Sequence, residues 1–503
     1  INPIIFEILL SKTEQELNSD WQSFFTFIPF LFLFELVASS LIWHRLRRLS
    51  RFKLGPIIAI FFFVCFLSGH LIYMWADAAV YRPVTAQKTT APEAHESLYW
   101  GTQVDDTNVT VYFAQDGDDV ATGDPEFNTM TAESWSAFEI AQFEAAFDML
   151  SAVSGLTFTV TTNANAADFT LVMDTDEFGD DGTLGFFNPP GEANEGVGVF
   201  NGDAWDDASL AEGGIAFVTI VHELLHGLGL AHPHDDGGGS TIMAGVTKDF
   251  DDFGDFDLNQ GVFTTMSYNS GYFTGTNGSA PSGDNFGYEA GPMALDIAVL
   301  QALYGVGGGH KAGDSNYKLA GANKAGTAWQ AIWDTGGIDE IRHAGGGAAV
   351  IDLRAATLEI EEGGGGFVSA VNGIRGGFTI AHDVIIENAS GGGQDDQITG
   401  NDVANVLNGA GGFDTMFGGD GADSLSGGAG NDVLIGGASN FDLTTSGQVD
   451  WTAEMLGAYR ALEISNPTLA NTGTAVDIFA SPEFAGVDTS SAGIAVTDMA
   501  VDT

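Results

Sequence analysis

The sequence predicts an N-terminal transmembrane helical hairpin, a central α+β domain and an all-β C-terminal domain built from repeats. Three observations predict this order. Two apolar runs of about twenty residues flank a basic segment near the N-terminus. Helical and strand patterns then follow without strict alternation, which favours an α+β arrangement. Finally, glycines recur with a nine-residue period over residues 391–435.

The hairpin is predicted over residues 1–92, with membrane spans at 24–43 and 54–75. Each run is long enough to cross a bilayer. The segment between them, HRLRRLSRFK, carries five positive charges, and the positive-inside rule places it in the cytoplasm. Two alternatives stay open: a buried helical hairpin of a soluble protein, and a signal peptide with a cleavage site at Ala76-Asp77-Ala78.

A resemblance supports the membrane interpretation. The stretch GHLIYMWADAAVYRPVTAQ resembles the end of the membrane domain of inner-membrane sulfatase-like proteins of Gram-negative bacteria. The resemblance covers about residues 1–92 and implies anchoring in the bacterial inner membrane through residues 24–75. Nothing after residue 95 resembles a sulfatase-like domain, so that family's function does not carry over. A natural fusion and a joining of two neighbouring coding sequences both remain open.

The charge of the chain is strongly uneven. There are 68 acidic against 16 basic side chains, for a net charge of -52, and half of the basic residues lie in residues 1–90. Such a surface repels phosphates, which argues against a nucleic-acid partner. The single cysteine, Cys65, lies inside an apolar run. A metal site elsewhere must therefore use histidine, carboxylate, tyrosine or backbone ligands.

The central domain is predicted over residues 98–305. Strands are expected at WGTQVDDTNVTVYFAQ, LTFTVTT and ADFTLVMD. Thr131 is expected to cap a helix that runs to about Val153, with Trp135, Phe138, Phe143, Phe147 and Leu150 on its apolar face. Further helices are expected from near Gly214 and over PMALDIAVLQALYG.

The helix that begins near Gly214 carries the metal motif HELLHGLGLAHPH. His222 and His226 are four residues apart, so both imidazoles share one helix face and reach one ion. Glu223 stands one position round the helix, which suits a base acting on water at the metal. His232 could not share that ion if the helix continued, so the chain must turn, and Gly229 permits the turn. The spacing predicts catalytic zinc; histidines on a helix surface or a structural metal site are the alternatives.

A second motif, TTMSYN, follows the histidines. Met266 is expected to form an apolar floor beneath the metal, although a methionine in a turn is more often core filler. Tyr268 could bring its phenol to the zinc. His234 fits no ligand spacing, and we expect it to face solvent or to stand behind the ligands, beside Asp235 and Asp236.

These residues resemble the metzincins, and among them the serralysin family of secreted bacterial zinc proteases. Pro233 after the third histidine and the Met-x-Tyr turn favour serralysins, and the resemblance covers about residues 98–435. It implies a zincin-like α+β catalytic domain in which His222, His226 and His232 bind one Zn²⁺. It further implies that Glu223 is the general base and that Tyr268 is a labile fourth protein ligand.

Residues 391–435 read as five nine-residue units that match the calcium-binding RTX repeat, GGxGxDxUx. A flexible linker is the alternative, but it would not place Ile398, Leu407, Met416, Leu425 and Leu434 at constant spacing. The units predict a parallel β-roll that binds several structural Ca²⁺ ions. Residues 306–390 are expected to be a β-rich connecting part, and residues 436–503 form a tail without a clear motif.

In this repeat family a calcium ion lies between turns two repeats apart. One edge then carries Asp396, Asp414 and Asp432, and the other carries Asn405 and Asp423. The second repeat has lost its aspartate, so we expect its edge to bind calcium weakly and the Asp414–Asp432 edge to bind best.

The predicted function is a calcium-stabilised zinc endopeptidase that cleaves extracellular proteins or peptides. Its protease part is expected to be extracellular or periplasmic. Two other classes remain: a non-catalytic RTX calcium-binding module, and a membrane-anchored regulator whose functional part is residues 1–92. A binding module has no need of Glu223 beside the ligands, which favours the enzyme.

Overall fold

The computed structural model describes residues 81–83, 93–123, 128–175, 178, 182–275, 280–436 and 499–502. Both predicted membrane spans lie outside these residues, as does most of the tail. Within the described ranges, no helix combines the length and the apolar character that crossing a membrane requires.

The central domain is built on a five-stranded sheet with the order β6-β3-β7-β9-β8. Strands β6, β3, β7 and β9 are parallel to one another, and the edge strand β8 is antiparallel to β9. Their bounds are β3 Asn108–Phe113, β6 Thr157–Val160, β7 Phe169–Asp174, β8 Gly185–Phe187 and β9 Val197–Asn201. Two antiparallel two-stranded sheets pair β1 Tyr81–Pro83 with β2 Thr102–Val104, and β4 Asp119–Ala121 with β5 Thr129–Thr131.

One predicted strand is divided in the structure. The stretch from Trp100 to Gln115 forms β2 and β3 rather than a single strand. The side chain of Asp106 accepts a hydrogen bond from the backbone N–H of Asn108 at 2.9 Å, which turns the chain between the two strands. The other two predicted strands appear as β6 and β7.

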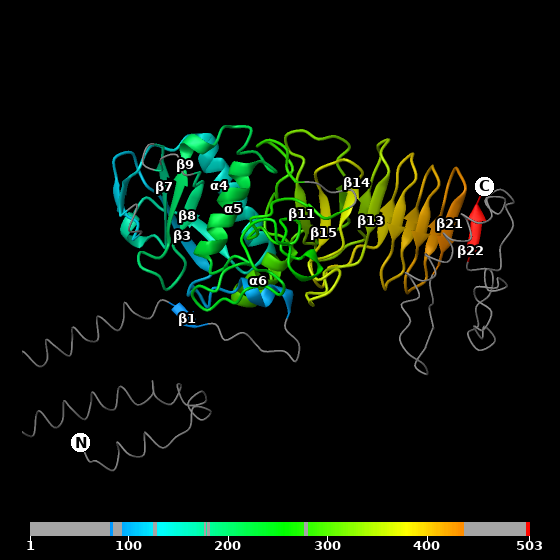
Figure 1. The fold of residues 1–503 in the computed structure, drawn as a ribbon, viewed down its shortest axis with the longest axis horizontal. Helices are drawn as coiled ribbons and strands as arrows, with labels where there is room; N and C mark the ends of the chain where they lie inside the picture. Colours follow the sequence, from blue (N-terminus) through cyan, green and yellow to red (C-terminus); the bar gives the residue numbers. More distant parts are fainter. Residues whose placement is uncertain are drawn as a thin grey trace, which may run out of the picture. The chain divides into compact units, whose positions relative to one another are not determined.

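Among the described residues, the α-helices that accompany the sheet are α4 Ala137–Val153, α5 Ile215–Gly227 and α6 Ala294–Tyr304 (Figure 1). The same residues include the short 3-10 helices η2 Ala94–Leu98, η3 Ala164–Ala166, η4 Gly202–Ala204 and η5 Asp255–Asp257. Helix α4 packs through Phe143, whose ring lies 4.8 Å from that of Phe200 in β9. The helices expected from Gly214 and over residues 292–305 are therefore present as α5 and α6.

The predicted start of the first helix is wrong. Thr131 ends β5, and Ser136 caps α4 instead. The Ser136 hydroxyl accepts from the backbone N–H of Glu139 at 3.1 Å, and the Glu139 carboxylate accepts from the backbone N–H of Ser136 at 2.6 Å. This reciprocal capping box defines the first turn more strongly than an isolated threonine can. Phe138 then faces outward, and Trp135 precedes the helix.

The C-terminal region is β-rich and continues into stacked parallel strands, as predicted. A five-stranded sheet has the order β10-β12-β16-β18-β20, and an eight-stranded sheet has the order β11-β15-β14-β13-β17-β19-β21-β22. The first sheet contains β10 Asn316–Lys318, β12 Glu340–Arg342, β16 Asn388–Ser390, β18 Val406–Asn408 and β20 Ser424–Ser426. The second contains β11 Trp329–Ile332, β13 Ala349–Asp352, β14 Ser369–Val371, β15 Gly377–Ile380, β17 Gln397–Thr399, β19 Thr415–Phe417, β21 Asp432–Ile435 and β22 Met499–Asp502.

Successive repeats alternate between the two sheets, so strands two repeats apart pair in parallel. Figure 1 shows these short strands stacked one behind the other up to β21. The apolar residue of each repeat points inward; Ile398, Leu407 and Met416 are fully buried. The same parallel ladders extend upstream of the repeats, because β12 pairs with β16 and β13 with β17.

Candidate metal centres

Helix α5 places two of the predicted zinc ligands. Its sequence, IAFVTIVHELLHG, is apolar along most of its length, and it packs against β8 and β9. The helix ends at Gly227, and Gly229 follows with a φ of 92°. A Cβ at Gly229 would collide with the carbonyl oxygen of Thr102, so only glycine makes this turn. The chain then doubles back to bring in His232.

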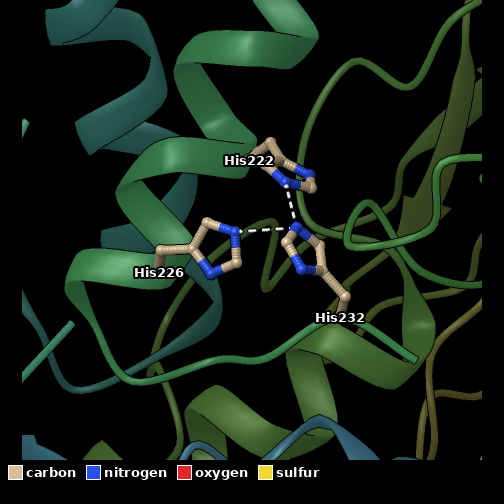
Figure 2. A group of neighbouring side chains, drawn as sticks. All are labelled: His222, His226 and His232. Atoms are coloured by element: carbon tan, nitrogen blue, oxygen red, sulfur yellow. Dashed lines mark hydrogen bonds between the residues drawn. The ribbon is translucent and has the colours of Figure 1, made fainter. Parts of the chain in front are cut away.

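The three predicted ligands meet in space. The Nε2 atom of His232 lies 3.0 Å from Nε2 of His222 and 3.0 Å from Nε2 of His226 (Figure 2). The Nδ1 atoms face oxygen acceptors: Thr265 O at 2.8 Å from His222, Leu230 O at 2.9 Å from His226, and the Asp235 carboxylate at 2.6 Å from His232. Each Nδ1 therefore carries the proton, and three Nε2 lone pairs face one point.

This donor set fits zinc. Burial lowers the pKa of His222 to about 4 and holds the pKa of His226 well below its usual value, so both imidazoles are neutral and able to bind a cation. Tetrahedral zinc with Zn–N bonds of about 2.0–2.1 Å separates ligand nitrogens by about 3.3 Å. The nitrogens need to move apart by only a few tenths of an ångström to reach that spacing.

Glu223 lies beside the histidines with a buried carboxylate. It is 7% exposed, and its Oε2 has no hydrogen-bond partner among the described residues. Burial raises the pKa of Glu223 to about 8. A divalent cation nearby would bring that pKa down again, toward the range of a group that takes up and releases a proton near neutral pH.

The turn that carries Met266 meets His222 through the Thr265 carbonyl and is hydrogen-bonded to helix α6. Met266 is fully buried. The Asp296 carboxylate accepts hydrogen bonds from the Thr264 hydroxyl at 2.6 Å and from the Thr265 backbone N–H at 2.7 Å. Since Thr265 O holds His222, Asp296 helps to orient a ligand. Sequence reasoning missed it, although an acid in the first turn of an otherwise apolar helix is a usable signal.

Tyr268 and His234 complete the ring cluster. The Tyr268 ring centroid lies 4.6 Å from that of His232 and 5.9 Å from that of His222. The His234 side chain is only 7% exposed, and its ring stacks on His232 at 4.8 Å and 9°. His234 thus stands behind the ligands beside Asp235 and does not face solvent. The role of Asp235 as partner of His232 was also missed in the sequence.

Three of the predicted calcium ligands form a ladder along one edge of the roll. The backbone N–H of Asp396 donates to Oδ1 of Asp414 at 2.9 Å, and that of Asp414 donates to Oδ1 of Asp432 at 3.0 Å. Oδ2 of Asp414 and of Asp432 is buried without a partner in the described part of the chain. Burial and the neighbouring Asp396 and Asp432 carboxylates raise the pKa of Asp414 to about 6. A bound cation would give the Oδ2 atoms a partner and would lower the pKa of Asp414.

The other edge has the same ladder with one weaker member. The backbone N–H of Asn405 donates to Oδ1 of Asp423 at 3.0 Å, and Oδ2 of Asp423 has no partner among the described residues. The Asn405 amide oxygen instead accepts from the backbone N–H of Asn401 at 2.9 Å. At Gly418 a Cβ would run into the Asp423 carboxylate, so glycine keeps the cradle open. These oxygen-only cradles fit Ca²⁺.

The ladder continues upstream, at a position that sequence reasoning missed. Asp339 is fully buried, its Oδ1 accepts from the backbone N–H of Ser315 at 2.7 Å, and its Oδ2 has no partner in the described ranges. The backbone N–H of Asp339 donates to the Glu387 carboxylate at 2.8 Å. The sequence around Asp339, GGIDEI, matches GGFDTM of the third repeat. It was missed because it stands alone, with no similar unit nine residues before or after it.

Comparison with known proteins gives the class of each part. Residues 127–260 match the matrixin family, residues 386–416 and 408–440 match the RTX calcium-binding nonapeptide repeat, and residues 1–97 match a domain family of unknown function. The cofactor prediction of catalytic Zn²⁺ and structural Ca²⁺ is thereby confirmed.

Individual relatives divide between the same parts. The chain is 31% identical to metallopeptidase AprA of Pseudomonas marginalis over 293 residues, which are 54% of this chain and 56% of that protein. It is 33% identical to serralysin of Proteus mirabilis over 201 residues, 38% of this chain and 36% of the relative. Inner membrane protein YejM of Salmonella typhimurium is 40% identical over 93 residues, 18% of this chain and 16% of its own length. The chain thus spans less than two thirds of each relative, and both predicted resemblances are confirmed.

Proposed function

We propose that the chain is a calcium-stabilised zinc metalloendopeptidase of serralysin type that hydrolyses peptide bonds of extracellular proteins. The observation that carries the proposal is the convergence of three histidine Nε2 atoms beside Glu223, whose buried Oε2 has no hydrogen-bond partner among the described residues. In this proposal residues 98–305 are a zincin-like metzincin domain, and residues 391–435 are a calcium β-roll.

In the proposed hydrolysis of a peptide bond, different residues of the chain have different roles. Zinc, when bound, supplies a Lewis acid that polarises the scissile carbonyl and lowers the pKa of water. Glu223 takes a proton from the attacking water and returns it to the leaving amine. Burial and the nearby Glu223 carboxylate raise the pKa of Tyr268, so it is a neutral phenol whenever it is not bound to the metal. In that form it donates a hydrogen bond to the oxyanion. The acceptors at the three Nδ1 atoms hold each imidazole in the binding tautomer.

The domain-family match of residues 1–97 and the similarity to an inner membrane protein support a membrane-anchored location for the chain. We propose that residues 1–92 anchor the chain in the bacterial inner membrane and that the protease part lies outside the cytoplasm. Protein or peptide substrates would then reach it in the periplasm or the medium. The acidic composition argues against nucleic acid as a partner.

The test is Glu223→Ala in the full chain, with Glu192→Ala on the exposed surface as the control. We expect cleavage of casein to fall by about 10³-fold or more, because the proton carrier is lost. Zinc content, measured by metal analysis, should stay at one per chain in both variants. Casein cleavage at the normal rate by Glu223→Ala would overturn the proposed mechanism.

A further inference from the structure

An exposed aromatic side chain lies against Tyr268. Phe250 is 58% exposed, yet its ring stacks on that of Tyr268 with centroids 5.1 Å apart and planes at 30°. Single exposed apolar side chains are common; what distinguishes Phe250 is that its ring contacts a side chain of the candidate metal centre. We infer that Phe250 is a positioning residue, which holds the Tyr268 ring at the metal centre.

The loop that carries Phe250 is fixed at both ends. The Asp252 carboxylate accepts from the backbone N–H of Thr247 at 2.8 Å and from its hydroxyl at 2.7 Å. Asp251, next to Phe250, has a φ of 54°, in the left-handed region that most residues avoid. Local geometry of this kind persists only where the surroundings enforce it.

The enforcing contact comes from the residue after Tyr268. The side chain of Asn269 accepts from the backbone N–H of Asp251 at 2.8 Å and donates to the backbone carbonyl of Asp252 at 3.2 Å. Asn269 is itself buried, and its amide also donates to the carbonyl of Asn259 at 3.0 Å. The loop that presents Phe250 and the turn that presents Tyr268 are therefore one hydrogen-bonded unit.

The Tyr268 ring has close neighbours of two kinds. His232 and His234 lie with ring centroids 4.6 Å away, and these belong to the histidine cluster itself. Phe250 contacts the ring from the loop of residues 247–252, and its side chain has no polar atom. Removing the Phe250 ring would thus leave the three histidines in place and allow the Tyr268 ring to sample more orientations.

The inference rests on the proposed function, in which Tyr268 hydrogen-bonds the oxyanion. An aromatic pair of this geometry is worth enough to change a rate by about 3- to 10-fold. We expect Phe250→Ala to lower kcat for peptide hydrolysis by that factor with little change in KM, since the contact acts in the transition state. Phe250→Tyr, which keeps the ring, should restore kcat. Phe256→Ala, a change of an equally exposed residue at 57%, should leave both constants unchanged.

The decisive measurement is a double-mutant cycle. If Phe250 acts through Tyr268, Phe250→Ala should have no further effect in a Tyr268→Phe background. A rise in KM alone would instead make Phe250 a substrate contact, and equal losses in both backgrounds would make it merely structural. Either result overturns the inference.

A spectroscopic readout separates this inference from the proposed function. In the Cu²⁺-substituted full chain, a phenolate-to-copper charge-transfer band reports Tyr268 at the metal, and Tyr268→Phe should abolish it. We expect Phe250→Ala to shift or weaken this band. A wild-type chain that shows the band but cleaves no peptide would refute the proposed function alone; a band unchanged by Phe250→Ala would refute the positioning role.

Discussion

The zinc centre and the calcium edges hold their ligands in different ways. At the zinc centre each histidine Nδ1 has an oxygen partner, so the protein itself orients the rings. Along the repeats, Oδ2 of Asp414 and of Asp432 is buried without a partner in the described part of the chain. The first site is organised before the metal arrives, whereas the second needs its ions to complete the fold. The two regions should therefore respond differently to loss of metal.

Calcium removal is expected to have the largest effect. Transfer of the full chain into calcium-free buffer that contains zinc should unfold residues 391–435 first, because their buried carboxylates then repel one another. We expect a fall in the melting temperature of that part on the order of 10 °C, seen by calorimetry and by hydrogen exchange of the repeat amides. Added calcium should reverse it. A melting profile that is the same with and without calcium would contradict the claim that the repeats need calcium to complete their fold.

The two calcium edges should differ by a smaller amount. Asp414→Asn removes the middle carboxylate of an edge with three, whereas Asp423→Asn affects an edge whose other member, Asn405, already engages its amide with the chain. We expect Asp414→Asn to weaken the tightest calcium binding by about tenfold, and Asp423→Asn to leave it nearly unchanged. Calorimetric titration of both variants measures this. Equal losses would show that the edges are equivalent.

Local spacing was enough to predict which candidate ligands lie together in the fold. Two histidines four residues apart share a helix face, and Gly229 permits the turn that returns His232, as its φ of 92° shows. The nine-residue period likewise predicts which aspartates share an edge, because it alternates strands between two sheets. Both rules depend on backbone geometry over a short stretch of sequence.

Asp296 and Asp339, which support those candidate ligands, carry only weak sequence signals, because their hydrogen-bond partners are distant in the chain. Asp296 reaches the zinc centre through Thr265, which lies 31 positions away. Asp339 joins the ladder through Glu387, which is 48 positions away. The predicted start of helix α4 at Thr131 is wrong for a different reason. The capping box of Ser136 and Glu139 is local and can be read from the sequence, and it outweighs the threonine that precedes it.

The last prediction concerns pH and the protease part alone. Glu289 is 1% exposed, and its carboxylate accepts from the backbone N–H of Gly271 at 2.6 Å. Burial raises the pKa of Glu289 from 4.5 to about 7. A raised folded-state pKa gives stability that is fully present below pH 4.5 and is lost as the pH rises through 7. Glu289→Gln keeps the acceptor and removes the charge, so its advantage over wild type should appear only at higher pH.

We expect Glu289→Gln and wild type to have the same free energy of unfolding of the protease part at about pH 4.5, and the variant to be more stable by about 1–3 kcal/mol at pH 8.5. Denaturant titration with calcium present measures this, because the β-roll then stays folded and does not contribute its own pH dependence. Glu192→Gln, on the exposed surface, should show no such difference between the two pH values. A variant that is less stable than wild type at pH 8.5 would mean that the ionised carboxylate stabilises the fold. The buried Glu289 carboxylate would then differ from those of the repeats, which we expect to destabilise the fold when they are ionised without calcium.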